Sequence, residues 1–184
     1  MKKITFTIAL SFYALLALSS ESESFKIPAY TYFNTQKIHE TPEQAVRSFL
    51  YWYRKNIDRL NNIQLVNQSF GKPYNVNKIN VIKYLNELKK SGFVSEKFLN
   101  SIEYYITMCD ANLLKIKQTE GPPEGFDMDM VLLMQDYESD FKLLEKAKTK
   151  NLTKTKIKFI FASENFLVFN LTPLKGKWLI ESIE

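Results

Sequence analysis

The chain has 184 residues, of which 45% are hydrophobic and 24% charged, with five glycines, six prolines, one cysteine and one histidine. These proportions are typical of one globular domain and exclude the collagen-like and disordered classes. A single cysteine cannot form an intramolecular disulfide, and a single histidine leaves no Cys/His cluster for a structural zinc ion. We therefore expect neither a disulfide scaffold nor a metal or other cofactor.

The N-terminal segment has the layout of a secretory signal peptide. Lys2 and Lys3 precede an uncharged apolar run over residues 4–20, and Ala17 and Ser19 are small residues at the spacing that signal peptidase requires. We predict a signal peptide over 1–19, and its removal from the 184 residues leaves 165. The alternative, an uncleaved anchor helix, is disfavoured because the strongly apolar part is shorter than the about 20 residues that cross a bilayer.

The charge balance argues against a nucleic-acid partner. Removal of Lys2 and Lys3 lowers the 25 basic side chains to 23 against 20 acidic ones, so the formal charge falls from +5 to +3. Nucleic-acid binding normally brings more arginine and a larger positive charge. We expect an exported protein, periplasmic or extracellular, with no stable membrane anchor after cleavage.

The first half of the mature chain predicts an extended arm followed by helices. Residues 20–40 show no helical or alternating period, whereas Thr41, Pro42 and Gln44 form a helix start with a capping box. Apolar residues then recur at helical spacing to residue 60. Further helices are predicted at about 77–91, with its apolar stripe on Ile79, Ile82, Leu85 and Leu88, and from Ser95 to about Leu113, with Cys109 on the buried face.

The last third predicts strands. The run over 126–137 is short and apolar in its middle, which favours a buried strand, although a helix of that length has the same pattern. Alternation at 157–161 and apolar runs at 166–171 and 178–183, separated by turn sequences, predict an antiparallel meander. Helices first and an antiparallel sheet last define the α+β class, a single domain over 41–184.

Four segments together resemble a known family. They are the helix string FLYWY at 49–53, YLNELKKSGFVSEKF at 84–98, DMVLLMQDY at 129–137 and GKWLI at 176–180. They resemble the secreted bacterial family known as domain of unknown function 3828. The resemblance covers about residues 41–184 and implies the nuclear-transport-factor-2-like fold, a cone in which helices pack into a curved antiparallel sheet. It implies no particular activity.

Acidic and amide side chains in the predicted strand are candidates for a ligand pocket. In an extended 127–135, Asp127, Asp129 and Gln135 share one face, with the two carboxylates ~6.5–7 Å apart, and Asp136 follows. Close carboxylates beside an apolar wall can act as acid or base. The alternative is structural, with the aspartates capping loop amides and Gln135 and Asp136 satisfying backbone groups.

Aromatic residues complete the candidate site. Trp52, Tyr53 and Trp178 carry polar groups that a pocket can use, although aromatic side chains at helical spacing more often belong to a core. His39, alone in the arm, is expected at the surface. Cys109 has no redox partner, which argues against catalysis by this thiol.

Two functions from different classes remain open. The favoured one is a non-enzymatic binding or interaction domain, whose cavity lies between helix 41–60 and the sheet and whose partner is a small ligand or an envelope protein. The alternative is an enzyme of the same fold with Asp129 or Asp127 as general base.

Seven lysines between residues 142 and 158 are interpreted as a solvated strand face that discourages edge pairing. The alternative is a patch for acidic polymers or lipid headgroups.

Overall fold

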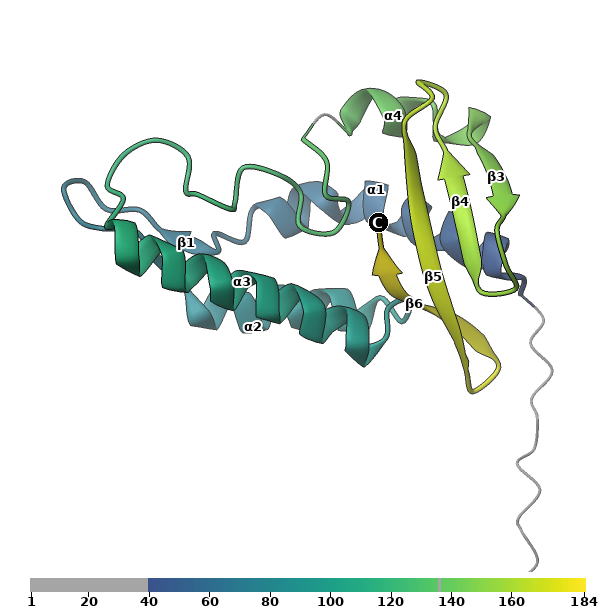
Figure 1. Cartoon of the computed structure of the whole chain (residues 1–184), viewed down its shortest axis with the longest axis horizontal. Helices are drawn as coiled ribbons and strands as arrows, with labels where there is room; N and C mark the ends of the chain where they lie inside the picture. Colours follow the sequence, from purple (N-terminus) through teal and green to yellow (C-terminus); the bar gives the residue numbers. More distant parts are fainter. Residues whose placement is uncertain (1–39, 136) are drawn as a thin grey trace, which may run out of the picture. The chain divides into compact units, whose positions relative to one another are not determined.

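The computed structural model describes residues 40–135 and 137–184 (Figure 1). The expected signal peptide, the arm up to His39, and Asp136 lie outside these residues. Helices occupy the first part of the described chain and an antiparallel sheet the last part, so the predicted α+β class is confirmed. The described residues contain no helix that is long and apolar enough to cross a membrane.

Helix α1 (Pro42–Asn61) begins at the predicted capping box. The Thr41 backbone N–H donates to Gln44 Oε1 at 2.8 Å, and the Gln44 N–H donates to Thr41 Oγ1 at 3.2 Å. Two otherwise unpaired donors are thereby satisfied at the helix start. The buried side chains of the helix are Ala45, Val46, Phe49, Leu50, Tyr53, Ile57 and Leu60.

A short hairpin leads into helix α2 (Lys78–Lys90), whose buried face differs from the prediction. Strands β1 (Val66–Asn67) and β2 (Asn75–Val76) pair antiparallel, and Asn77 caps the helix. The buried side chains are Val81, Tyr84 and Leu88, whereas Ile79 and Ile82 are exposed. The prediction is confirmed for Leu88, and Leu85 packs against the core, but it was wrong for Ile79 and Ile82, because Tyr84, with an apolar ring and a polar tip, was left out of the apolar set.

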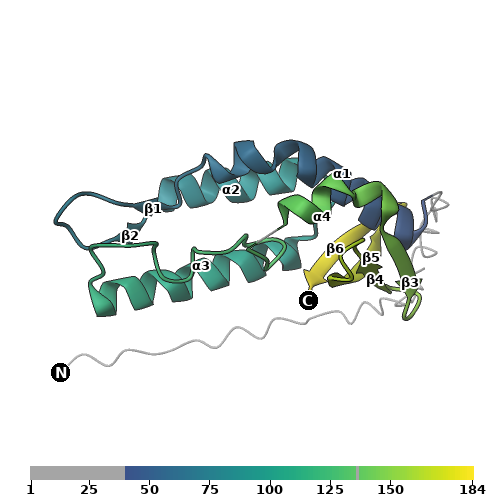
Figure 2. The ribbon, with the colours of Figure 1, turned by 90° about the horizontal axis from the view of Figure 1, so that it is seen from above.

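Helix α3 (Glu96–Ile116) follows after Gly92, whose φ of +73° is readily adopted only by glycine. Ser95 caps the helix as predicted, and Cys109 lies on its buried face. Helices α2 and α3 contact each other and lie side by side in both views (Figures 1 and 2).

The sheet has four antiparallel strands in sequential order: β3 (Lys148–Asn151), β4 (Lys156–Ile160), β5 (Phe166–Leu174) and β6 (Lys177–Ile183). The predicted meander is confirmed as β4–β6. Ile157 and Phe159 are buried and the intervening Lys158 is half-buried on the other face, as alternation requires. Strand β3 was not predicted, because it has no buried residue that would reveal a period of two.

The helical pair is joined to the sheet through the α2–α3 connection. Val94 forms a bridge with Ile180 of β6, where the Ile180 N–H donates to Phe93 O at 2.9 Å and the Ser95 N–H donates to Ile180 O at 2.9 Å. Helix α1 contacts β4 and β6. The sheet therefore contacts α1 and holds the start of α3.

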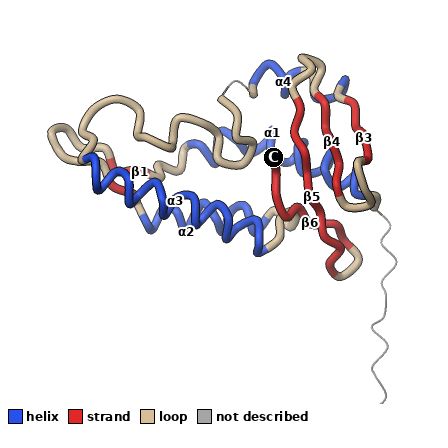
Figure 3. Tube along the Cα trace, in the orientation of Figure 1, coloured by secondary structure: helices blue, strands red, loops and turns tan. Residues whose placement is uncertain are grey.

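The strand predicted over 126–137 is wrong. The described part of this segment is a loop, shown in tan between α3 and α4 in Figure 3, and the short helix α4 (Glu138–Lys142) and a 3-10 helix (Leu144–Lys146) follow it. Leu133 has a φ of +55°, and its N–H donates to Asp129 O at 2.8 Å, which closes a tight turn. A strand would require extended backbone throughout, so the alternating aspartates do not share one face.

Candidate functional site

Asp129 organises the loop between α3 and α4. Its Oδ1 accepts hydrogen bonds from the backbone N–H groups of Val131 at 2.9 Å and Leu132 at 2.7 Å, and its Oδ2 accepts one from the Tyr53 hydroxyl at 2.7 Å. The carboxyl is buried, with 9% of the residue exposed. The structural alternative, an aspartate that caps loop amides, therefore describes Asp129, although no strand follows it.

Burial shapes the titration of this cluster. Burial raises the pKa of Asp129, while the hydrogen bonds from Leu132, Tyr53 and Val131 oppose this rise. Burial raises the pKa of the Tyr53 phenol, and Tyr84 and then Asp129 raise it further, whereas the pKa of Tyr84 is raised by burial and then by the Asp129 carboxyl. Both tyrosines are therefore neutral hydrogen-bond donors near neutral pH, and Asp129 is held by three donors that belong to the fold.

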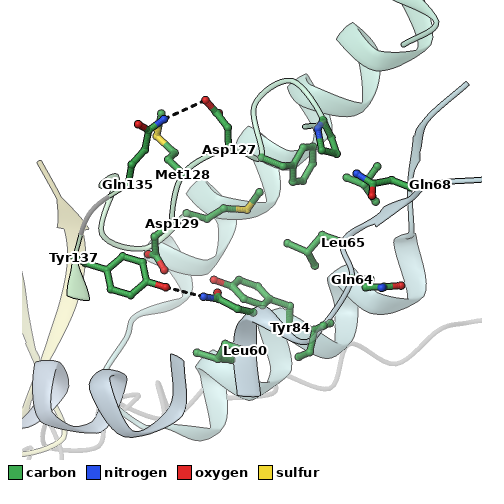
Figure 4. A pocket seen from close by; sticks show the side chains of 16 residues that line it. Leu60, Gln64, Leu65, Gln68, Tyr84, Asp127, Met128, Asp129, Gln135 and Tyr137 are labelled. Atoms are coloured by element: carbon green, nitrogen blue, oxygen red, sulfur yellow. Dashed lines mark hydrogen bonds between the residues drawn. The ribbon is translucent and has the colours of Figure 1, made fainter. Parts of the chain in front are cut away.

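A pocket of about 530 Å³ lies beside this cluster, between the segment after α1 and the loop residues 123–135 with Tyr137 (Figure 4). Its volume is within the range of small-molecule sites. Asp127, Asp129 and Gln135 of the predicted set line it. The other lining residues are Leu60, Asn61, Ile63, Gln64, Leu65, Val66, Gln68, Tyr84, Pro123, Phe126, Met128, Met130 and Tyr137.

The polar groups of the pocket are mostly uncharged. The amide of Gln135 donates to Asp127 Oδ2 at 3.3 Å, and the amide of Asn61 donates to the Tyr137 hydroxyl at 2.9 Å, as the dashed lines in Figure 4 show. Asp127 is exposed, in contrast to Asp129. No lysine or arginine is among the sixteen described residues that line the pocket.

The predicted aromatic residues separate into different environments. Tyr53 reaches the pocket cluster through Asp129. Trp52 packs instead against Phe49 and Phe93, with ring centroids 6.2 Å apart in each pair. Trp178 lines a different pocket with residues 41–43 at the start of α1, and the structure does not bring it to Asp129.

Aromatic rings fill the middle of the interface between helix 41–60 and the sheet, where a cavity was predicted, and the pocket that includes Trp178 lies at the edge of this interface, at the start of α1. Phe49 of α1 lies 6.3 Å from Phe169 of β5, and Phe159 of β4 lies 6.5 Å from Phe169, measured between ring centroids. All three side chains are completely buried. The pocket beside Asp129 lies instead near the C-terminal end of α1, where Leu60 and Asn61 contribute to its wall.

Sequence reasoning missed Tyr84, Tyr137 and the amides of Asn61, Gln64 and Gln68. The spacing of Tyr84 from Val81 and Leu88 was a usable signal, because it places the three residues on one helical face. The Asn- and Gln-rich connection after α1 carried no such signal. It becomes a pocket wall only through the loop that packs opposite it.

Within residues 40–135 and 137–184 there is no group of three or more His, Cys, Asp or Glu side chains arranged to hold a metal ion.

Comparison with known proteins found no matching family model, no matching curated protein and no matching solved structure. The resemblance to domain of unknown function 3828 therefore stays a prediction.

Proposed function

We propose that the protein is a non-enzymatic binding domain that takes a small neutral or cationic molecule in the pocket lined by Gln64, Tyr84, Asp127 and Met128. The lining supports this proposal: apolar and thioether side chains bury the body of a ligand, and amides and phenols orient its polar groups. With carboxylates present and no basic side chain in the wall, an anionic ligand would bury its charge without a partner.

One observation carries the proposal, the contrast between the two aspartates. The Asp129 carboxylate accepts three hydrogen bonds from the fold, whereas Asp127 is exposed at the pocket and has one long bond of 3.3 Å to Gln135. Asp127 is therefore the carboxylate that can meet an ammonium group. Asp129 is a poor general base because fixed donors already occupy both of its oxygens, so the enzymatic alternative receives no support from this geometry.

The location and the wider fold family complete the proposal. A signal peptide over 1–19 would export the domain to the periplasm or the medium, where the partner is a small ligand or an envelope protein. A helix packed on a sequential four-stranded antiparallel sheet supports a relation to the nuclear-transport-factor-2-like fold. In this proposal the ligand site lies at the end of α1 and not inside the cone.

Three probes of similar size and different charge test the ligand class: benzylamine, benzyl alcohol and benzoate. We expect ligand-observed NMR to give millimolar binding, as for fragments of this size, in the order benzylamine, benzyl alcohol, benzoate. Asp127→Asn should weaken benzylamine by about two- to fivefold, as expected for a partly exposed ion pair, and leave benzyl alcohol unchanged. Glu103→Gln on the exposed face of α3 is the matched control. Equal or tighter binding of benzoate would contradict the proposal.

A further inference from the structure

One end of the α2–α3 pair carries apolar side chains that neither the core nor the pocket uses. We call this end the tip and define it by the hairpin turn 68–74, the first turns of α2 at 78–83 and the last turn of α3 at 114–117. Phe70 is fully exposed, Ile79 is 80% exposed and Ile82 61% exposed, and Leu114 and Ile116 are each at least half exposed. Single exposed apolar residues are ordinary, whereas five on one end of a molecule indicate an interaction surface.

Backbone contacts bring the three segments of the tip together. The Tyr74 N–H donates to Gln118 O at 2.7 Å, which joins the hairpin to the end of α3. The hairpin also leads directly into α2, because Asn77 caps that helix one residue after β2. Figures 1 and 2 both show the hairpin at the end of the helical pair that is remote from the sheet.

Lysines alternate with the apolar residues of the tip. Lys72, Lys78, Lys83, Lys115 and Lys117 are all exposed, and none forms an ion pair with another described residue. The three segments contain no aspartate or glutamate. The tip therefore combines exposed apolar side chains with uncompensated positive charge, the composition of elements that lie in the interface of an anionic membrane.

We propose that the tip is a peripheral docking surface for anionic lipid bilayers, with Phe70 entering the acyl boundary and the lysines contacting the headgroups. Charge complementarity selects this occupant over a second copy of the chain, since two tips would bring ten lysines together without a carboxylate from either. The apolar side chains are also separated by lysines, an arrangement that a fluid interface accommodates more readily than the contiguous core of a protein interface.

Phe70→Trp provides a test on the full chain, in which the emission of the native Trp52 and Trp178 is subtracted with the parent protein. We expect Phe70→Trp emission to shift to the blue on addition of phosphatidylcholine vesicles with about 30% phosphatidylglycerol, and to be quenched by brominated lipid. Phe166→Trp is the matched control, because Phe166 is 52% exposed on the sheet with Lys158 Nζ 3.5 Å from its ring centroid. Both variants have the same N-terminus, so any vesicle binding through residues 1–39 is common to them.

Charge and self-association are tested in the same assay. In the Phe70→Trp background, Lys72→Gln and Lys78→Gln should each weaken vesicle binding about fivefold, and raising the salt concentration should weaken it further. Equal insertion into vesicles of phosphatidylcholine alone, or equal insertion by the Phe166→Trp control, would overturn the proposal. A blue shift that grows with protein concentration without vesicles would show that a second copy covers the tip and would overturn it as well.

Discussion

Replacing Asp129 by alanine should destabilise the domain strongly, because this carboxyl joins the α3–α4 loop to α1. The change removes the acceptor of the Tyr53 hydroxyl and of the Val131 and Leu132 N–H groups. A hydrogen bond to a charged group contributes about 1.5–3 kcal/mol, and burial of the charge offsets part of the sum of three. We expect the free energy of unfolding to fall by about 3 kcal/mol.

Two milder variants divide this effect. In Asp129→Asn the amide oxygen can keep both backbone bonds, so a loss of about 1 kcal/mol is expected. Tyr53→Phe removes one hydrogen bond and should cost about 1–2 kcal/mol. Asp127→Ala, at an exposed carboxylate with one long bond, is the control and should change stability by less than about 0.5 kcal/mol.

Urea unfolding followed by circular dichroism measures these four differences. We expect Asp129→Ala to lose clearly more stability than either milder variant. An Asp129→Ala domain within about 0.5 kcal/mol of the parent would refute it, because three buried donors would then have lost their acceptor at no cost.

Three further predictions address pH dependence, backbone strain and a second buried carboxyl. Burial raises the pKa of Asp129 above the unfolded value of about 3.9. The stability that this group contributes is therefore present below that pH and is lost as pH rises through the folded pKa. In urea melts, the free energy of unfolding of the parent minus that of Asp129→Asn should fall above about pH 4, and a rise would contradict this. Gly125→Ala should lower the free energy of unfolding by about 2 kcal/mol, since φ is +83° and the new Cβ would lie 2.5 Å from Cys109 Sγ. Adding Cys109→Ala should recover part of this loss in thermal melts. Asp140→Ala, which removes the acceptor of Ser163 and Asn165 in the β4–β5 turn, should cost about 2 kcal/mol in the same melts, whereas an unchanged melt would show that these bonds contribute nothing.

Local signals in the sequence predicted the elements that local interactions form. The capping box of Thr41 and Gln44, the Ser95 cap and the alternation around Ile157 all correspond to observed structure. The predicted strand over 126–137 failed because a short run that is apolar in its middle does not distinguish a buried strand from a loop whose apolar residues, here Val131 and Leu132, pack into the core. The backbone there follows instead a contact with Tyr53, which lies 76 positions away in the chain and leaves no periodic signal.

The candidate site was predicted in composition better than in arrangement. Asp127, Asp129 and Gln135 do line one pocket, but their roles differ because one carboxyl is buried and the other exposed. The opposite wall comes from the connection after α1 and from Tyr84, and long-range packing decides that pairing. In the register of β6 against β5, Trp178 lies opposite Pro173. The sequence does not give this register, so Trp178 could not be placed from it.

Methionine methyl NMR with benzylamine tests the central claim, that the pocket binds a neutral or cationic small molecule. Met128 and Met130 line the pocket, and Met108 is exposed on α3 as an internal control. Titration should shift the methyl signals of Met128 and Met130 with one common dissociation constant, leave that of Met108 in place, and weaken in Asp127→Asn. Shifts confined to Met108, or no saturable shift of the pocket methyls with benzylamine or benzyl alcohol, would contradict the claim.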